Sequence, residues 1–292
     1  MMKIDSHMIK FRNSLVQIVP SYGCNITSLT LDRQSILDAN TDPEKLASDY
    51  LCKSDFLAPF PNRVSDGKYT FQGKTYQLVT NEQERGHALH GFITQKKFSM
   101  TLESSDSDES VAVFQTEIKP DEFQGYPFYL QISTSFQLTT TRLTITMTGK
   151  NIGNTEAPYG VGWHPYLTVG KSINDCMLQI QARSVLETSK IKELIPTGKK
   201  LSNPFGTNKK LIGNAKFDTC FTDLESNTVI FENIELFMDN TMKYVQMYTP
   251  DDRQSIAIEP MSCAPDAFNN DMGRIALKPQ QSVSHTFGLR II

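Results

Sequence analysis

One histidine and one glutamate of this sequence stand in segments that otherwise look built for burial. His164 lies in the run Gly-Val-Gly-Trp-His-Pro-Tyr-Leu at 160–167, which holds the single Trp of the chain. Glu259 follows the apolar run Ser-Ile-Ala-Ile at 255–258, where a carboxylate is costly unless it is paired or in use. An imidazole and a carboxylate together make an acid–base pair. Taken alone, His164 is equally well explained as a satisfied histidine of a β core.

The local pattern predicts how these two side chains are presented. The segment 160–167 is expected to be a short buried strand, in which alternate side chains point to opposite faces. His164 then shares a face with Gly162 and Tyr166, where it can contact a small polar ligand. Glu259 is expected to end its strand, because the following Pro260 has no N–H to continue the hydrogen-bond ladder.

Four further polar positions are candidates for ligand contacts. Asn62 and Arg63 follow a Pro-Phe-Pro turn, and the fixed donor fork of Arg suits sugar hydroxyls or a carboxylate, although a surface Arg capping a loop is an equally ordinary explanation. His87 and His90 are three residues apart, but no third ligand stands at metal-site spacing, so no metal is expected and His87 is predicted to be a satisfied loop histidine. Asp218 precedes an aromatic segment, where a lone Asp is usually a turn or cap residue.

Composition narrows the class of protein. The 292 residues carry 29 Lys+Arg and 32 Asp+Glu, a net charge of −3, with no basic block, so a nucleic-acid partner is not expected. The N-terminus lacks the apolar core of a signal peptide, and no run approaches the roughly 18 apolar residues of a membrane helix, so no membrane association is expected. The five cysteines are scattered and odd in number, which favours reduced thiols and a cytoplasmic location.

The pattern of segments predicts an all-β protein. Many short strand-like runs recur, and convincing amphipathic helices are nearly absent, which favours one large antiparallel β domain over 1–292. Residues 69–78 are predicted to form a hairpin, residues 139–141 a turn, and residues 39–55 a loop or short helix. Residues 197–216, rich in Gly, Asn, Lys and Pro, are expected to be an irregular excursion.

Five short motifs, in order along most of the chain, together resemble the aldose 1-epimerase (galactose mutarotase) family. They are Pro-Asn-Arg-Val with Gly-Lys-Tyr-Thr-Phe-Gln-Gly at 61–73, His-Ala-Leu-His-Gly at 87–91, Gly-Trp-His-Pro-Tyr at 162–166, Asp-Thr-Cys-Phe at 218–221, and Ile-Glu-Pro-Met with Pro-Asp-Ala-Phe-Asn at 258–269. The chain departs from the family at Leu167, where Phe is common, and at Phe98, where Trp is expected. Both departures bear on which sugar is bound.

The resemblance implies a fold, an activity and a set of roles. The fold would be a large antiparallel β-sandwich, the galactose mutarotase-like supersandwich, with an open cleft. The activity would be a cofactor-independent isomerase that interconverts the α and β anomers of an aldohexose or related sugar. Glu259 would be the general base and His164 the general acid. His90, Arg63 and Asp218 would bind the sugar, with Asn62 assisting.

Reference pKa values near 4.3 for Glu and 6.5 for His predict a charged Glu259, which would help to keep His164 protonated. Neither a dinucleotide-binding Gly-rich motif nor a P-loop is present, in keeping with an activity that needs no cofactor. Two alternatives stay open: a β-sandwich glycosidase or lyase that pairs Glu259 with Asp218 or Asp266, and a sugar-binding protein without catalysis. The sequence leaves open a free or a phosphorylated sugar, with the Lys pairs at 199–200 and 209–210 as candidate phosphate ligands, and a monomer or a homodimer.

Overall fold

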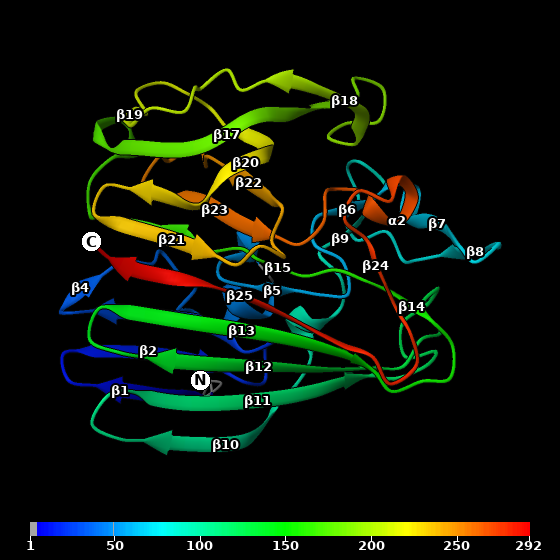
Figure 1. Ribbon diagram of the computed structural model, residues 1–292, viewed down its shortest axis with the longest axis horizontal. Helices are drawn as coiled ribbons and strands as arrows, with labels where there is room; N and C mark the ends of the chain where they lie inside the picture. The colour runs from blue at the N-terminus through cyan, green and yellow to red at the C-terminus, as the bar shows by residue number, and fades with distance from the viewer. Residues whose placement is uncertain (1–4, 49) are drawn as a thin grey trace.

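The computed structural model describes residues 5–48 and 50–292, and antiparallel strands dominate it (Figure 1). Fifteen strands belong to one large sheet: β5 (Phe56–Leu57), β10 (Ser99–Ser105), β11 (Ser110–Ile118), β12 (Leu130–Leu138), β13 (Arg142–Asn151), β15 (Gly162–Trp163), β16 (Tyr166–Leu167), β17 (Met177–Thr188), β18 (Pro196–Ser202), β19 (Lys210–Leu211), β20 (Asp218–Phe231), β21 (Ile234–Met238), β22 (Tyr244–Tyr248), β23 (Ile256–Met261) and β25 (Ser282–Ile291). The neighbours along its main path are β10-β11-β12-β13-β25-β21-β20-β22-β23-β15-β5. The predicted all-β antiparallel class is therefore confirmed.

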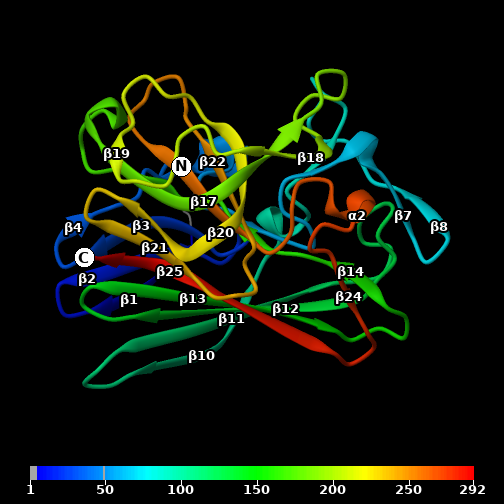
Figure 2. The same cartoon turned by 45° about the horizontal axis from the view of Figure 1, so that its top comes forward.

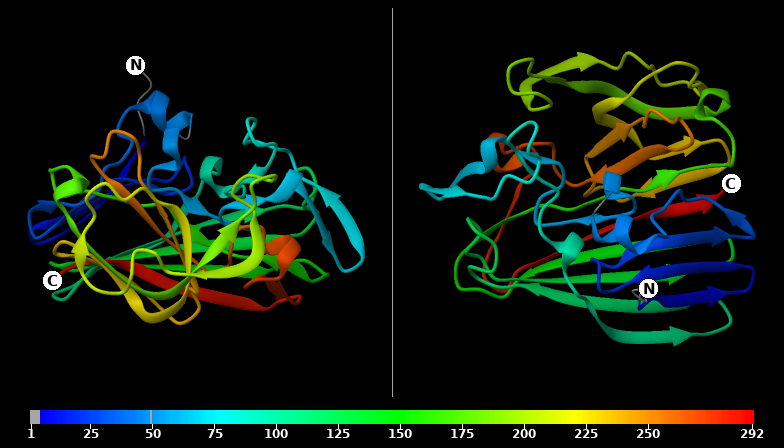
Figure 3. Two further views of the ribbon diagram at one scale, coloured as in Figure 1. Left: turned by 90° about the horizontal axis from the view of Figure 1, so that it is seen from above. Right: turned by 180° about the vertical axis from the view of Figure 1, so that it is seen from behind.

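Smaller elements surround this sheet. A four-stranded meander contains β1 (His7–Phe11), β2 (Ser14–Val19), β3 (Asn25–Leu31) and β4 (Gln34–Ser35), and it lies against one face of the large sheet (Figure 3, right). Three two-stranded pairs are β6 (Arg63–Val64) with β9 (Ala88–Leu89), β7 (Lys68–Phe71) with β8 (Lys74–Gln77), and β14 (Ala157–Tyr159) with β24 (Ile275–Leu277). The helices are short: α1 (Pro43–Ala47), α2 (Ala267–Asn270) and the 3₁₀ turns η1 (Tyr50–Cys52), η2 (Ser65–Gly67), η3 (Ile93–Gln95) and η4 (Ile173–Asp175). The hairpin of β7 and β8 projects with α2 from one end of the sheets (Figure 2). In the described part of the chain, no helix has the length and apolar character needed to cross a membrane.

The core lies between the meander and the large sheet. Strands β11, β12 and β13 alternate strictly between buried and half-buried residues, as expected when one face of a strand packs inward. An aromatic cluster fills the centre, where the rings of Trp163, Phe56 and Phe287 contact one another in a triangle, with Trp163 at 5.9 Å between centroids from each phenylalanine. Because neighbouring side chains alternate, burying Trp163 in this cluster turns the next residue, His164, toward the opposite face.

Local predictions succeeded where the signal is local. The hairpin over 69–78 and the turn at 139–141 are confirmed, and α1 lies within the segment expected to be a loop or short helix. The irregular excursion over 197–216 is wrong in part, because β18 and β19 both pair with β17 from within or beside this segment. The local composition gave no sign of that long-range pairing.

The prediction that Pro260 stops its strand is wrong. Strand β23 continues to Met261, and Pro260 stands opposite Val245 of β22. The interruption lies on the side of β23 away from β22, where two short strands, β15 and β16, pair with β23 and are separated at His164-Pro165. That side of β23 carries no continuous ladder at this point, so a missing N–H is tolerated there.

Candidate active site

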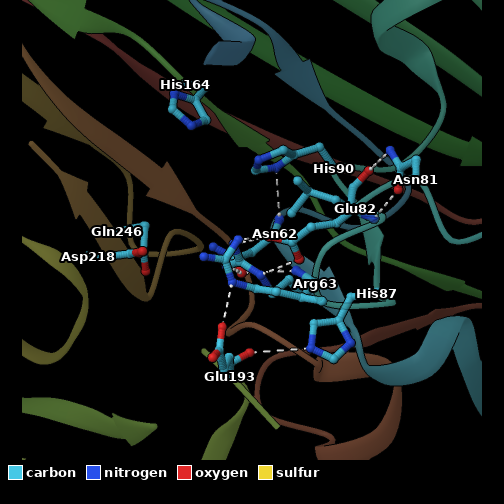
Figure 4. Close-up of polar contacts among 12 residues, drawn as sticks. Asn62, Arg63, Asn81, Glu82, His87, His90, His164, Glu193, Asp218 and Gln246 are labelled. Atoms are coloured by element: carbon cyan, nitrogen blue, oxygen red, sulfur yellow. Dashed lines mark hydrogen bonds and ion pairs between the residues drawn. The ribbon is translucent and has the colours of Figure 1, made fainter. Parts of the chain in front are cut away.

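A cleft of about 240 Å³ collects all six residues that the sequence motifs singled out. This volume lies below the range of roughly 300–1,000 Å³ that is usual for drug-sized ligands, so the cleft fits a smaller molecule. Figure 4 shows His164, His90 and Arg63 converging on it, with Asp218 and Gln246 approaching from neighbouring strands. The complete lining is Leu51, Cys52, Asn62, Arg63, Arg85, Leu89, His90, His164, Tyr166, Asp218, Gln246, Tyr248 and Glu259.

His164 and Glu259 touch at the floor of this cleft. Nε2 of His164 lies 3.4 Å from Oε1 of Glu259, and the two side chains are 8% and 2% exposed. Within the described residues, neither Nδ1 of His164 nor Oε2 of Glu259 has a hydrogen-bond partner on another residue. Buried polar atoms are nearly always satisfied, so an unsatisfied atom on each member of a contacting pair is unusual and calls for an explanation. The alternative of a fully satisfied core histidine does not fit this geometry.

The break between β15 and β16 places His164. Its backbone is fixed on both sides, because its N–H donates to the carbonyl of Asp55 and its carbonyl accepts from the N–H of Ser54, each at 2.9 Å. The imidazole stacks on Tyr166 with centroids 5.2 Å apart and planes 14° apart. The predicted shared face of His164 and Tyr166 is therefore confirmed, although the strand itself is interrupted at Pro165.

The short strand pair of β6 and β9 positions Arg63, which belongs to β6, and Asn62 and His90, which flank the two strands. Asn62 and His90 sit at adjoining ends of this pair, where the His90 N–H donates to the Asn62 carbonyl at 2.8 Å. The Asn62 N–H in turn donates to Nδ1 of His90 at 3.3 Å, which leaves Nε2 as the N–H of a neutral ring. His90 meets His164 edge to face at 5.3 Å between centroids. Both Asn62 and His90 have positive φ, 56° and 65°, a conformation that clusters at functional sites in non-glycine residues.

Gly91 explains why the second motif ends in glycine. Its φ is 74°, and a Cβ at this position would lie 2.2 Å from the carbonyl oxygen of Ala58. A side chain is therefore excluded by backbone atoms that cannot move aside. The close approach holds His90 against the segment that leads to Asn62.

Arg63 is held by a carboxylate that the sequence did not single out. Its Nε and one terminal nitrogen each donate to an oxygen of Glu82 at 2.8 Å, and the other terminal nitrogen donates to Oδ1 of Asn62 at 3.2 Å. Arg85 shares Oε1 of Glu82 at 3.0 Å and reaches Glu193 at 3.2 Å. This paired geometry fixes the plane of the Arg63 guanidinium at the wall of the cleft.

Asp218 and Gln246 complete the cleft from the large sheet. Nε2 of Gln246 donates to Oδ1 of Asp218 at 2.9 Å, and Gln246 stands opposite Glu259 in the register of β22 and β23. Sequence reasoning missed Gln246. The available signal was a lone amide between Val245 and Met247 in an otherwise apolar strand, which needs a reason once that strand is known to be buried.

The electrostatics differ from the expectation of a preformed ion pair. Burial lowers the pKa of His164 to about 4, with Arg63 adding to the effect. Burial, and then the neighbouring Asp218, raise the pKa of Glu259 well above its usual value, while Arg63 acts against this rise. The prediction of a protonated His164 is therefore wrong for the unliganded cleft, because loss of hydration disfavours both charged forms. The same burial raises the pKa of Asp218 and lowers that of His90.

Several residues considered from the sequence lie outside the cleft. His87 is buried, with Nδ1 accepting from the Asp66 N–H at 3.2 Å and Nε2 3.3 Å from the Glu193 carbonyl, so both ring nitrogens are used structurally. Oδ1 of Asp266 accepts from the Ser65 N–H and from Asn269, which makes it a loop anchor. The Lys pairs at 199–200 and 209–210 are absent from the lining. Across residues 5–48 and 50–292, no group of His, Cys, Asp and Glu is arranged to hold a metal ion.

Comparison with known proteins decides the family. The family model described as aldose 1-epimerase matches residues 7–290. This chain belongs to the aldose 1-epimerase family. The uncharacterized protein YihR of Escherichia coli K12 is 32% identical over 264 residues, which are 85% of this chain and 82% of that protein. The galactose mutarotase of Bos taurus is 28% identical over 61% of this chain and 52% of its own length.

Solved structures confirm the fold that the family implies. A galactose mutarotase-like protein from Clostridium acetobutylicum superposes with a TM-score of 0.85 at 21% identity, covering 98% of this chain and 94% of that one. The galactose mutarotase-like β-sandwich predicted from the motifs is therefore the fold of this aldose 1-epimerase family member. At this identity the likeness concerns the fold alone.

Proposed function

We propose that this family member is a mutarotase, which interconverts the α and β anomers of an aldohexose or a related aldose at the Glu259–His164 pair. The observation that carries the proposal is the 3.4 Å contact between these two buried groups, each with a polar atom unused by other residues. A pyranose brings two oxygens that must exchange protons, the C1 hydroxyl and the ring oxygen. A carboxylate and an imidazole in contact can serve both at once.

The proposed reaction balances without an external acid or base. Glu259 takes the proton from the C1 hydroxyl while His164 gives a proton to the ring oxygen, and the C1–O5 bond breaks to leave the open-chain aldehyde. The C1 end then turns about the C1–C2 bond. Closure returns each proton in the reverse direction, and attack on the other face of the carbonyl gives the other anomer. The pair holds the same single proton before and after each turnover.

Substrate binding stabilises the charged forms of Glu259 and His164, which burial disfavours in the empty cleft. In the unliganded cleft the shared proton is favoured on Glu259, since the pKa of His164 is lowered and that of Glu259 raised. Sugar hydroxyls that donate to the Glu259 carboxylate at the cleft replace part of its lost hydration and stabilise its charged form. The proton then passes to His164 across the existing contact. The two sites therefore titrate as one coupled pair with a single exchangeable proton.

The remaining cleft residues are proposed to orient the sugar. Arg63 offers fixed donors, Asp218 and Gln246 offer acceptors and an amide, and His90 presents its Nε2–H. Asn62 is proposed to assist indirectly, by bracing Arg63. Holding the reacting oxygens against the acid and the base converts binding energy into rate.

Catalysed exchange between anomers tests this proposal directly. Polarimetry or NMR exchange on freshly dissolved α-anomers should show accelerated equilibration, and Glu259→Gln and His164→Asn should each slow it by about 10²–10⁴-fold. Glu235→Gln is the matched control, because Glu235 is also a buried carboxylate, paired with Arg290 at 2.7 Å, but it does not line the cleft. Full activity in either active-site variant would contradict the assigned roles.

A panel of substrates distinguishes the proposal from its alternatives. Free aldoses, phosphorylated aldoses and β-linked oligosaccharides should be tested together. Release of a new reducing end that tolerates His164→Asn would indicate a glycosidase or lyase. Saturable sugar binding without faster anomer exchange would indicate a binding protein. The two arginines of the cleft both pair with Glu82, which favours a neutral sugar over a phosphorylated one.

A further inference from the structure

The segment between η1 and β5 holds the backbone of His164. The Ser54 N–H donates to the His164 carbonyl, and the Asp55 carbonyl accepts from the His164 N–H, each at 2.9 Å. The buried Asn25 of β3 fixes this segment in turn, because its amide donates to the Lys53 carbonyl at 2.8 Å and to the Asp55 carboxylate at 2.6 Å. The main chain of His164 is therefore anchored to the four-stranded meander.

The ring of Tyr166 gives the imidazole a second support. A fixed main chain still leaves the two side-chain torsions of a histidine to be settled by what its ring contacts. The stack on Tyr166, with centroids 5.2 Å apart and planes 14° apart, restricts the plane of the His164 ring, whose Nε2 lies 3.4 Å from Glu259. A residue that holds the Tyr166 ring therefore acts indirectly on the acid–base pair.

The side chain of Lys53 reaches the Tyr166 ring from outside the cleft. Its Nζ lies 5.4 Å from the ring centroid, within the range of a cation–π contact. Lys53 does not line the active-site cleft but a separate polar groove, which it shares with Asp38. Its side chain is only 11% exposed, so water weakens the contact with the ring little.

Asp38 fixes the position of the Lys53 ammonium group. Its Oδ2 lies 2.6 Å from Nζ of Lys53 and also accepts from the hydroxyl of Ser255 at 2.7 Å. Its N–H donates to the Tyr166 carbonyl at 2.9 Å. Asp38 thus binds the main chain of Tyr166 with its backbone and the ammonium group with its carboxylate, which directs the cation onto the tyrosine ring.

We propose that Lys53 is a positioning residue for His164: its ammonium group holds the Tyr166 ring, and that ring holds the imidazole against Glu259. The effect on the rate rests on the proposed function, whereas the contacts themselves do not. Because Lys53 is not part of the cleft lining, its loss leaves the sugar-binding side chains in place and disturbs only the acid. Such a change lowers kcat more than it raises KM.

Anomer-exchange kinetics on lysine variants test the proposal. Lys53→Met keeps the length of the side chain but removes its charge, so kcat per folded molecule should fall about five- to twentyfold while KM changes less than about twofold. Lys53→Arg keeps a cation and should recover most of the loss. Lys96→Met is the matched control, because Lys96 also lies over an aromatic ring, Phe123 at 5.9 Å, and pairs with Glu122, but neither line the cleft.

A second variant guards against loss of the fold in Lys53→Met. Asp38→Asn keeps the main-chain bond to Tyr166 but removes the charge that holds the ammonium group. It should also lower kcat more than it changes KM. Urea unfolding gives the folded fraction of each variant, so that the rates are compared per folded molecule.

NMR of the His164 imidazole gives a readout that does not depend on activity. In protein with isotope-labelled histidine, the signal that is lost in His164→Asn reports the ring current of Tyr166. Lys53→Met should shift or broaden this signal, and Lys96→Met should not. A shifted signal in a protein without anomer exchange would refute the proposed function and keep the positioning contact. Wild-type kcat in Lys53→Met, or a lowered kcat with an unmoved His164 signal, overturns the positioning role.

Discussion

Replacing Glu82 by Gln tests most directly the proposal that a fixed Arg63 orients a sugar in the cleft. Burial acts to raise the pKa of Glu82, but the hydrogen bonds and charges of Arg63 and Arg85 outweigh it, and the net pKa is lowered. The carboxylate is therefore ionised, and it fixes the Arg63 guanidinium through two bonds of 2.8 Å between side chains only 11% and 10% exposed. Gln keeps the shape but removes the charge and one of the two acceptors.

The magnitude follows from this geometry. Charge-assisted hydrogen bonds contribute about 1.5–3 kcal/mol each, and breaking a buried pair costs about 3–5 kcal/mol, so Glu82→Gln should destabilise the fold by about 2–4 kcal/mol. Arg63 would then leave its fixed plane. A misplacement of about 1 Å in a positioned group costs up to 10²-fold, so kcat/KM per folded molecule should fall by about 10–100-fold. The loss should appear mainly in KM, because Glu259 and His164 are untouched.

Anomer-exchange kinetics and denaturant unfolding on the same samples separate the two effects. Glu193→Gln is the matched control: Glu193 is 65% exposed and contacts Arg85 but not Arg63, so its loss should change kcat/KM less than about twofold. Glu82→Asp should recover part of the activity. Wild-type kcat/KM in Glu82→Gln, corrected for the folded fraction, would refute a positioning role and leave Glu82 as a stabilising residue only.

Three further outcomes are expected. Asp218→Asn should lower kcat/KM by about tenfold through a lost sugar contact. It should also shift the alkaline limb of the pH–rate profile to lower pH, because the Asp218 charge contributes to the raised pKa of Glu259. An alkaline limb at the wild-type pH would count against this coupling between Asp218 and Glu259. Gly91→Ala should destabilise the fold by more than about 2 kcal/mol in urea unfolding, whereas Gly73→Ala, with the same φ of 74° but open space around its Cβ, should cost only about 1 kcal/mol. Burial lowers the pKa of His285 to about 4, so between about pH 6.5 and pH 4 the unfolded chain binds a proton at this residue that the folded chain does not bind. The free energy of unfolding should therefore fall by about 2 kcal/mol through this group between neutral pH and pH 5. In His285→Asn, denaturant unfolding should show a weaker dependence of this free energy on pH.

The predictable part of the fold came from short-range patterns. Period-two alternation in β11, β12 and β13 and the turn chemistry of the β7–β8 hairpin both act over a few residues, so composition and spacing reveal them. The pairing of β18 and β19 with β17 and the passage of β23 through Pro260 depend on which distant strands happen to lie alongside. No local signal carries that information.

The candidate site divides in the same way. Glu259 stood out in advance as a carboxylate at the end of an apolar strand, whereas the roles of Asn62, Arg63, His90 and Asp218 came from the resemblance of their motifs to the family. Glu82, Arg85 and Gln246 were missed, since charged and amide residues in loops and strands are ordinary until their neighbours are known.

The amino-acid sequence by itself determined the β class, the family and the identity of an imidazole and a carboxylate suited to proton transfer. Only the tertiary structure decided that these groups touch at 3.4 Å, that Glu82 braces Arg63, and that burial moves the pKa values of His164 and Glu259 toward their neutral forms. The physical reason is that side-chain type is a property of one residue, whereas the distance between two side chains and their hydration depend on how the surrounding strands pack. Protonation depends on hydration, so it cannot be assigned before the burial of the pair is known.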